Sequence, residues 1–356
     1  MKIGLTGLPG SGKTTIFNAL TRSNAPVGSF TGVDAEPNQA IISVPDERID
    51  RLVEIYNPRK TVNAVVEILD FPANSDRESN TSSLSANTIR EIRNMDAIGI
   101  VTRNFHDNLK GEPELLNDIK AISGDLLFSD LIIVETRLER IQLQYKRGQK
   151  SIKLENEEKI LKKIQTKLDN NEALIDLELD QGEEKLIRGF QFLTRKPFLI
   201  IINSSEDNFA SNSDDVNVVL DQYNAIEFAG KFEQELTQID DPEEIRMFMD
   251  DMGIKISARD RLTRKAYDIL GYISFFTVGD DEVRAWNIIM GTNAVTAAGV
   301  IHTDLARGFI RAECFTYDDL INSGSEKAVK QAGKFRLEGK EYIVQDGDIL
   351  GIRFNV

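Results

Sequence analysis

Apolar and polar runs alternate over the N-terminal third of the chain in the manner of strands that take turns with helices. The opening apolar run, residues 2–8, is broken by the glycine-rich stretch GLPGSGK, and the helix-compatible segment TTIFNALT follows at once. A second helix-like segment, TIREIRNMD, covers residues 88–96. Such alternation favours a mainly parallel sheet that is covered by helices on both faces. Further strands are predicted at QAIISV (39–44), AVVEILD (64–70) and AIGIV (97–101).

A different period begins near residue 125. From Leu131 to Tyr145, apolar residues recur at spacings of 3, 4, 3 and 4. After the charged stretch 147–153, the apolar positions between Leu154 and Leu168 continue a seven-residue period. Two such arms around a short polar turn predict an antiparallel helical hairpin of the coiled-coil type, with Glu and Lys on its outer faces. The pattern does not distinguish a solvated insertion from an arm that docks on a partner.

The strand signal returns at KPFLIIINSSED (196–207), where Pro197 interrupts the preceding helix, and again at NAIEFAG (224–230). Residues 231–273 are predicted to be largely helical. Beyond Gly271, short strand-like pieces surround one helix-compatible stretch, AVTAAGVIHTDL, which predicts a compact mixed-sheet module. The strand-like pieces are FFTV (275–278), VRAWNIIM (283–290), ECFTYDDL (313–320), KEYIVQ (340–345) and ILGIRFNV (349–356).

These changes of pattern divide the chain into three predicted domains. Residues 1–124 together with 196–273 form an α/β domain, residues 125–195 form a helical insertion, and residues 274–356 form the C-terminal module. The length of 356 residues, with 41% apolar and 28% charged residues, fits a soluble globular protein of about two or three domains.

The composition narrows the possible chemistry. A single cysteine, Cys314, excludes a disulfide framework, and with only His106 and His302 beside it the chain offers little for a zinc cluster or a catalytic triad. The formal charge of −15 argues against broad nucleic-acid binding, so no DNA partner is expected. No apolar stretch reaches the length of a membrane span, and the N-terminal residues already form a predicted strand and turn. We therefore expect a cytoplasmic protein without a membrane partner.

The stretch GLPGSGKT at residues 7–14 satisfies the phosphate-binding pattern G-x-x-x-x-G-K-[ST] in full, between a predicted strand and a predicted helix. Gly10 and Gly12 let the loop curl so that its N–H groups point at phosphate oxygens, and the helix N-terminus adds partial positive charge. Lys13 is expected to bridge the β- and γ-phosphates, and Thr14 to offer its hydroxyl to Mg²⁺. The nucleotide-binding residues predicted here are Gly7, Leu8, Pro9, Gly10, Ser11, Gly12, Lys13, Thr14 and Thr15.

Two enzyme classes remain open on this pattern. Small P-loop phosphotransferases use the same loop, but they need an arginine-rich lid, and no compact arginine cluster occurs in the middle of this chain. Switch-type nucleotide hydrolases need a base-reading asparagine on a later strand, where Asn203 stands. They also need a metal-steering aspartate at a strand end, where Asp70 stands.

Several ordered motifs resemble the Obg-like ATPases, the YchF subfamily of the translation-factor-related P-loop GTPases. They are GLPGSGKTTIFNALT at the start, AEPNQAIISVPDERIDRLVEI after the first helix, NSSE at 203–206, and the C-terminal run from ISFFTVGDDEVRAWNI to DGDILGIRFNV. The resemblance covers the whole chain in the same order. It implies a P-loop fold with an inserted helical hairpin and a C-terminal β-grasp-like TGS domain. It also implies an ATP-hydrolysing regulator, with Mg²⁺ as cofactor and the ribosome or a ribosomal subunit as partner. A monomer is expected.

The resemblance also bears on nucleotide choice. Guanine-specific relatives carry Asn-Lys-x-Asp, whereas this family carries Asn-x-x-Glu, which Asn203 and Glu206 match with Ser204 in the lysine position. The longer acid loses the bidentate fit to guanine, so ATP is expected to be preferred over GTP, with Asn203 bonding the N6/N7 edge of adenine. The alternative is that Glu206 is an ordinary loop acid. Three further predicted nucleotide contacts are Ala229, Gly230 and Lys231.

The chain departs from the family at the segments that should sense the γ-phosphate. Gly10 and Ser11 replace the family's Asn-Val pair, and Asp34 stands where the family has a threonine that is a candidate magnesium ligand. Asp34 can bind Mg²⁺ through oxygen, but its charge repels the γ-phosphate. At the third predicted strand end Asp70 keeps the metal-steering carboxylate, whereas Ala73 replaces the family's glycine and restricts the backbone.

Hydrolysis is therefore expected to be slow or impaired. Lys13 and Asp70 are the predicted catalytic residues. His106, in FHDNLKG after the fourth predicted strand, is a further candidate for orienting the attacking water, and a plain surface histidine is the alternative. A nucleotide-gated binding protein that does not hydrolyse is the alternative function.

The C-terminal module is locally more basic than the rest of the chain. Its cations predict either a contact face for the ribosome or a surface that is merely kept soluble. They are Arg307, Arg311, Lys327, Lys330, Lys334 and Arg336.

Overall fold

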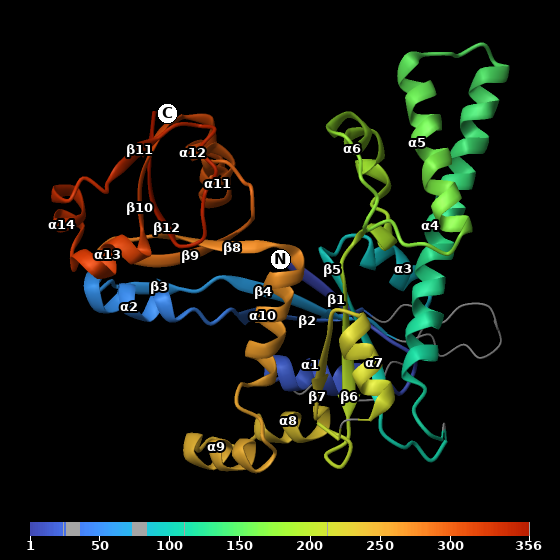
Figure 1. Cartoon of the computed structure of the whole chain (residues 1–356), viewed down its shortest axis with the longest axis horizontal. Coiled ribbons are helices and arrows are strands. Elements are labelled where there is room, and N and C mark those ends of the chain that lie inside the picture. Colours follow the sequence, from blue (N-terminus) through green and yellow to red (C-terminus); the bar gives the residue numbers. More distant parts are fainter. Residues whose placement is uncertain (24, 26–35, 73–83, 110, 212, 356) are drawn as a thin grey trace. The chain divides into compact units, whose positions relative to one another are not determined.

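The computed structural model describes residues 1–23, 25, 36–72, 84–109, 111–211 and 213–355 (Figure 1). By their contacts the residues group into two compact units. The larger unit comprises residues 2–40 and 67–259, and the smaller one comprises Met1 with residues 41–66 and 260–356. Among the described helices, none is long and apolar enough to cross a membrane.

The larger unit is built on a six-stranded sheet in the order β2-β4-β1-β5-β6-β7. β1 pairs in parallel with both β4 and β5, and β6 pairs in parallel with both β5 and β7. The α/β fold with a mainly parallel sheet, predicted from the alternating runs, is therefore confirmed. The strands are β1 (Lys2–Thr6), β2 (Asn38–Ser43), β4 (Val65–Asp70), β5 (Ala97–Asn104), β6 (Phe198–Ser204) and β7 (Ala225–Phe228).

Helices pack against this sheet through apolar side chains at helical spacing. Ile119 and Ile122 of α4 and Val219 of α7 join Ile100 of β5 and Ile202 of β6 in one buried cluster, while α1 contacts β1 and α8. The helices are α1 (Lys13–Thr21), α3 (Ala86–Ile92), α4 (Leu115–Lys146), α5 (Ile152–Asp169), α6 (Gln181–Ile187), α7 (Asp214–Gln222), α8 (Gly230–Leu236) and α9 (Pro242–Asp251), with single 3-10 turns at Arg188–Phe190 and Leu193–Arg195.

α4 and α5 form the helical hairpin that the seven-residue period predicts (Figure 1). Val134 of α4 and Ile164 of α5 belong to its buried core. Gly148, with φ of 76°, lies in the turn between the helices, and the Ser151 hydroxyl accepts a hydrogen bond from the Leu154 N–H to cap α5. α4 begins ten residues before the change of pattern near residue 125, because its first turns pack against the sheet, starting at Leu115.

The smaller unit has its own six-stranded sheet, in the order β11-β10-β12-β8-β9-β3. β8 with β9, and β10 with both β11 and β12, pair antiparallel, whereas β12 with β8 and β3 with β9 pair in parallel. The strands are β3 (Lys60–Val62), β8 (Tyr272–Thr277), β9 (Glu282–Ile289), β10 (Phe309–Thr316), β11 (Arg336–Glu338) and β12 (Asp348–Phe354). The helices are α2 (Glu47–Tyr56), α10 (Ala258–Leu270), α11 (Ala294–Ile301), α12 (Thr303–Arg307), α13 (Tyr317–Ser323) and α14 (Glu326–Gln331).

Two strand predictions in this unit need correction. The strand expected at 340–345 is wrong, because the Tyr342 carbonyl accepts from the Ala294 N–H and the segment is held as a loop beside the start of α11. The strand expected at 313–320 ends at Thr316. The Thr316 hydroxyl accepts from the Asp319 N–H, and this cap starts α13 instead.

Candidate functional site

The phosphate loop joins β1 to α1, as the sequence predicts. Gly10 and Gly12 have φ of 76° and 85°, in the left-handed region that glycine adopts without strain. A Cβ atom on Gly12 would lie 2.0 Å from the Nδ2 atom of Asn203, so this position also has no room for a side chain. Among the described residues no side chain caps the N-terminus of α1. Its first N–H groups are therefore suited to bind an anion.

Lys13 lies buried at the base of this loop. Its Nζ atom donates to the Gly7 carbonyl at 3.0 Å and to the Leu8 carbonyl at 3.5 Å. The ammonium group is thus hydrogen-bonded to carbonyl oxygens of the loop itself. A phosphate oxygen would compete for the same donor with a stronger, charge-assisted hydrogen bond.

Thr14 and Asp70 meet at the metal end of the loop. The Thr14 hydroxyl donates to Asp70 Oδ2 at 2.9 Å, and Asn38 Nδ2 donates to the same oxygen at 3.2 Å. The Asp70 carboxyl is fully buried, and burial raises its pKa, an effect that the hydrogen bond from Thr14, the charge of Lys13 and the bond from Asn38 partly offset. Asp70 Oδ1 has no hydrogen-bond partner among the described residues.

This donor set fits Mg²⁺. A hydroxyl oxygen and a carboxylate oxygen are the hard ligands that the ion prefers, and the unpartnered Asp70 Oδ1 is a buried acceptor that a cation or its bound water would satisfy. Sequence reasoning therefore selected two residues that the structure brings together. The third predicted ligand, Asp34, and the glycine replacement Ala73 lie outside the described residues.

Asn203 lies between the phosphate loop and the start of α8. Its Nδ2 atom donates to the Ser11 carbonyl at 2.9 Å. On the other side, a Cβ atom on Gly230 would lie 2.2 Å from Asn203 Oδ1, so this glycine too stands against the amide. The asparagine thus spaces the phosphate loop from Gly230. The predicted contact Gly230 borders the loop through this side chain, and the predicted contact Ala229 directly precedes Gly230 in the chain.

A cavity of about 520 Å³ opens beside Asn203. This volume lies within the range of about 300–1,000 Å³ that is usual for small-molecule sites. The cavity brings together residues that are far apart in the sequence but were predicted to act together, among them Gly12, Glu206 and Lys231. The full lining is Gly12, Thr15, Phe105, His106, Asn203, Ser204, Ser205, Glu206, Asp207 and Lys231.

His106 is placed on the wall of this cavity, next to the base loop, which we define as residues 203–210. Its Nδ1 atom lies 3.0 Å from Glu112 Oε1. Neither Thr14 nor Asp70 is among the described residues that line the cavity. The cavity thus places His106 with the predicted base site and with Gly12 and Thr15 of the phosphate loop.

Sequence reasoning missed the polar network beneath the base loop. Ser204 is buried and its hydroxyl donates to Glu227 Oε1 at 2.5 Å, while Asn104 Nδ2 donates to the Ser204 oxygen at 2.8 Å. The Ala210 N–H donates to Glu227 Oε2 at 3.3 Å, so the carboxylate of Glu227 holds both ends of the loop. The available signal was the position of Asn104 and Glu227 near the carboxyl ends of parallel strands, where α/β folds gather ligand-binding groups.

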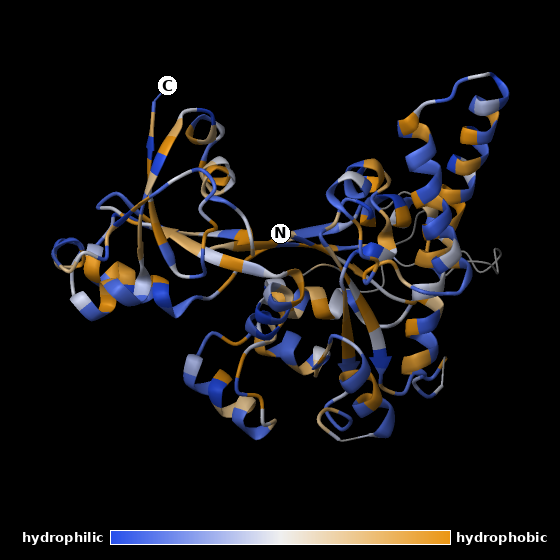
Figure 2. Cartoon of the chain, turned by 45° about the horizontal axis from the view of Figure 1, so that its top comes forward, coloured by the Kyte–Doolittle hydropathy of each residue, from blue (hydrophilic) through white to orange (hydrophobic). Residues whose placement is uncertain are grey.

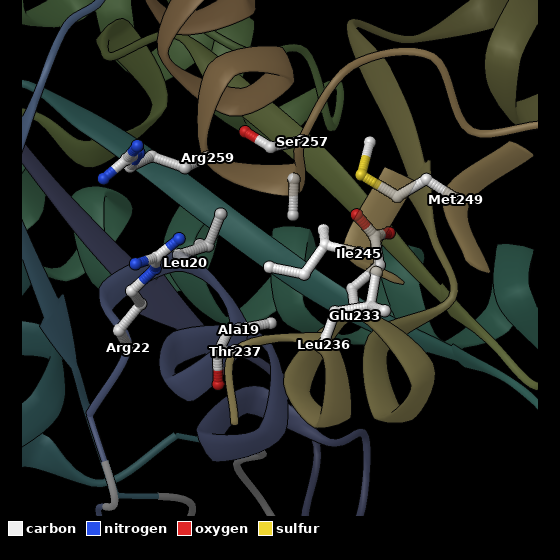
Figure 3. A pocket seen from close by; sticks show the side chains of 11 residues that line it. Ala19, Leu20, Arg22, Glu233, Leu236, Thr237, Ile245, Met249, Ser257 and Arg259 are labelled. Carbon is white, nitrogen blue, oxygen red and sulfur yellow. The ribbon is translucent and has the colours of Figure 1, made fainter. Parts of the chain in front are cut away.

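A second, smaller pocket lies at the C-terminal end of α1, between α8 and α9. Figure 3 shows the guanidinium groups of Arg22 and Arg259 on one side and Met249 and Ile245 on the other. At about 80 Å³ it is too small for a nucleoside, so the larger cavity is the candidate nucleotide site. The pocket is lined by Ala19, Leu20, Arg22, Glu233, Leu236, Thr237, Ile245, Met249, Ser257, Ala258 and Arg259.

Two family models match the chain. The model described as a 50S ribosome-binding GTPase matches residues 2–204. The model YchF-GTPase_C, which carries only the description "protein of unknown function", matches residues 272–355. Together they cover the phosphate loop, the base-site asparagine and nearly all of the C-terminal module.

Individual relatives agree with these matches. The ribosome-binding ATPase YchF of Bacillus subtilis is 38% identical and aligns over 99% of this chain and 99% of its own. The protein of the same name from Haemophilus ducreyi is also 38% identical, over 100% of this chain and 99% of its own. The structure of the YchF GTPase of Schizosaccharomyces pombe superposes with a TM-score of 0.84 at 29% identity, over 99% of this chain and 97% of that one.

Proposed function

The chain belongs to the YchF family, and from this premise we propose that it is a P-loop ATPase that binds ATP in preference to GTP, hydrolyses it slowly and regulates translation at the ribosome. The observation that carries the proposal is the hydrogen bond between the Thr14 hydroxyl and the buried Asp70 carboxylate, beside a phosphate loop that begins a helix. The relatives named as ribosome-binding ATPases support the choice of partner. A ribosomal partner implies that the protein acts in the cytoplasm.

Different residues around the phosphate loop are expected to bind the metal ion and the phosphates. When bound, Mg²⁺ supplies positive charge to the β- and γ-phosphate oxygens. Thr14 Oγ1 and the Asp70 carboxylate are the groups that would hold it. We expect Lys13 Nζ to exchange the carbonyls of Gly7 and Leu8 for phosphate oxygens, because a bond between two charged groups is the stronger one.

The preference for ATP rests on the base loop. Ser204, which stands where guanine-specific relatives carry lysine, lines the cavity but donates its hydroxyl to Glu227 and has no long aliphatic stem to cover a base. Glu206 lines the cavity and is longer than the aspartate that accepts the two N–H donors of guanine. Without the lysine stem and the bidentate acid, discrimination in favour of guanine is reduced.

Slow hydrolysis is supported by the surroundings of His106. The imidazole faces the Glu112 carboxylate and lines the cavity with the base loop, whereas the metal ligands Thr14 and Asp70 are not among the described lining residues. A general base has to lie within hydrogen-bond reach of the attacking water. The same observation favours the second candidate function, a nucleotide-gated binding protein that does not hydrolyse.

A single-turnover assay with ATP, Mg²⁺ and K⁺, run with and without ribosomes, tests the proposal. Turnover that is lost in Lys13→Ala but kept in the surface variant Lys185→Ala supports the ATPase. Binding of ATP without turnover in both conditions supports the gated binder instead. GTP binding tighter than ATP binding by about tenfold, or about 1.4 kcal/mol, contradicts the proposed base preference.

The metal role of Asp70 has a separate test. Asp70→Asn keeps the shape of the side chain but removes its charge, so the gain in ATP affinity on adding Mg²⁺ should be lost. ATP binding in the presence of a chelator should change little, since Lys13 and the loop N–H groups are intact. Equal loss of affinity with and without Mg²⁺ would assign Asp70 a structural role only.

A further inference from the structure

The turn of the helical hairpin concentrates positive charge in a chain that is otherwise acidic. Residues 140–154 contain five cations and no Asp or Glu, whereas the whole chain carries a formal charge of −15. All five side chains are exposed at the end of α4, in the turn, or in the first turn of α5. We call them the basic tip: Arg140, Lys146, Arg147, Lys150 and Lys153.

None of these five cations forms an ion pair with a described residue. The Lys150 ammonium lies 5.7 Å from the centre of the Tyr145 ring, a cation–π contact that leaves its charge uncompensated. Closer to the sheet the same two helices pair their charges. Arg137 of α4 makes two hydrogen bonds to the Glu157 carboxylate of α5, at 2.6 and 2.8 Å. The five cations of the tip thus differ from Arg137, whose charge is neutralised within the hairpin.

The hairpin carries the tip away from the nucleotide site. α4 has 32 residues, which corresponds to a length of about 48 Å. The first turns of α4 pack against the sheet, and the tip lies at the opposite end of the hairpin (Figure 1). Figure 2 colours the connecting turn as hydrophilic. A large partner can reach such a tip without covering the phosphate loop of the same unit.

We propose that the basic tip binds the phosphate backbone of RNA, and that this contact is one of the points at which the chain docks on the ribosome. Only the second part of this inference, docking on the ribosome, rests on the ribosome association proposed above. Closely spaced, uncompensated cations match the closely spaced charges of a nucleic-acid backbone, and binding releases the counterions of both. The exposed Gln149 amide and Ser151 hydroxyl add neutral donors of the kind that bond phosphate and ribose oxygens.

RNA fits the tip better than an anionic membrane does. Leu143 and Ile152 are 50% and 78% exposed, and they are the large apolar side chains that the tip presents. Interfacial helices that bind membranes bury a continuous apolar face along their length. Two apolar side chains on either side of a tight turn do not form such a face.

Fluorescence anisotropy of a labelled RNA duplex with the full chain tests the tip. We compare the native chain, the tip variant Lys146→Glu/Arg147→Glu/Lys150→Glu and the control Lys120→Glu/Lys185→Glu/Arg188→Glu, which changes the net charge equally at exposed positions elsewhere in the larger unit. The tip variant should bind about 100-fold more weakly and its slope of log affinity against log salt should fall by about three. The control should stay within about threefold of the native chain.

Two results of this assay overturn the proposal: the absence of RNA binding by the native chain, and equal losses in the tip variant and the control. A parallel flotation assay with phosphatidylserine vesicles adds a third, which is tip-dependent binding of vesicles without binding of RNA. ATP binding that matches the native chain shows that both variants are folded.

Co-sedimentation with ribosomes separates this inference from the proposed function. If the native chain sediments with ribosomes and the tip variant does so equally well, the docking role of the tip is refuted while ribosome association stands. If the native chain never sediments with ribosomes but binds RNA through its tip, ribosome association fails and the RNA site stands. Loss of sedimentation in the tip variant alone supports both parts of the proposal.

Discussion

The two ends of the helical hairpin differ in whether their charged side chains are buried and paired. At the base, Asp130 of α4 is fully buried and accepts hydrogen bonds from the N–H groups of Leu193 and Thr194, from the Thr194 hydroxyl and from Arg93. At the tip, five exposed cations form no ion pair with a described residue. Charges that are buried and fully partnered build the fold, whereas charges that are exposed and unpartnered remain available to another molecule.

Most cations of the C-terminal module are paired with acids, as the charges at the sheet end of the hairpin are, and in this they differ from the cations of the basic tip. Four of the six that were predicted to form a contact face have an acid of the same unit within 4 Å, namely Arg307 with Asp304, Lys330 with Glu326, Lys334 with Asp319 and Arg336 with Asp348. A count of basic residues in the sequence does not reveal this pairing. The contact face of the module therefore stays a prediction, and the tip is the stronger candidate for a nucleic-acid contact.

The largest expected effect on stability is at the end of the hairpin that meets the sheet. Asp130→Ala leaves the Arg93 guanidinium and the N–H groups of residues 193–194 without their acceptor, so the free energy of unfolding should fall by about 3–5 kcal/mol. Urea unfolding followed by circular dichroism measures it. Glu135→Ala, at an exposed position of the same helix, is the matched control and should change stability by less than about 0.5 kcal/mol. If the two variants lose equal stability, the buried Asp130 contributes no more than the exposed Glu135.

The second effect extends the comparison to a buried cluster of the C-terminal module. Burial raises the pKa of the Cys314 thiol to about 12, with the charge of Asp348 adding to the shift and Arg336 opposing it. Between pH 9 and 12 the unfolded chain releases this proton and the folded chain keeps it, so stability falls as the pH rises. The slope approaches about 1.4 kcal/mol per pH unit.

Cys314→Ala isolates this contribution to the pH dependence. The stability difference between the native chain and the variant, measured by denaturant unfolding at pH 8 and at pH 10.5, should change by about 2 kcal/mol. A difference that is independent of pH would show that the folded thiol titrates normally.

The third effect lies in the middle of the hairpin. Glu157→Gln removes the charge of a carboxylate that is largely buried and bonded twice by Arg137, so stability should fall by about 1–2 kcal/mol. Glu155→Gln, two residues nearer the tip and exposed, should change it by less than about 0.5 kcal/mol. Thermal unfolding of both variants at equal ionic strength provides the measurement. If the Glu157 variant is as stable as the Glu155 variant, the Arg137–Glu157 pair contributes no more to stability than the exposed charges near the tip.

The smallest expected effect on stability is at the tip itself. The triple charge reversal of Lys146, Arg147 and Lys150 removes no ion pair to a described residue. It removes the contact of Lys150 with Tyr145 and puts acids at the C-terminal end of α4, so stability should fall by no more than about 1 kcal/mol. Urea unfolding checks this in the same protein preparation that is used for RNA binding. A large loss of stability would mean that these cations are structural.

Much of the fold could be predicted from local patterns. The strand at Val65–Asp70, the helix at Lys13–Thr21 and the two arms of the hairpin follow directly from apolar spacing and from glycines at turns. The strand predicted at 340–345 failed, because its alternating residues bond to the loop before α11 rather than to a neighbouring strand. Alternation indicates that a segment can form a strand, but pairing requires a partner edge that the local sequence does not contain.

The candidate site shows the same division. The phosphate loop and Asp70 follow from a short motif and a strand end, because their chemistry depends on residues that are adjacent in sequence. The network of Asn104, Ser204 and Glu227 joins three separate strands, and no spacing in the sequence predicts it. The hydrogen bond that ties Ser204, at the cavity wall, to Glu227 could only be learned from the folded chain.

The sequence by itself determined the phosphate loop, the parallel sheet around it, the hairpin and the family to which the chain is similar. Tertiary structure alone decided that residues 41–66 group with the C-terminal residues, where β3 pairs with β9, and that His106 lies beside the base loop. It also decided which cations are neutralised and which are free at the basic tip. The physical reason is that local patterns reflect backbone geometry and burial of one element, whereas strand pairing and ion pairing depend on which distant residues the folded chain brings within a few ångströms.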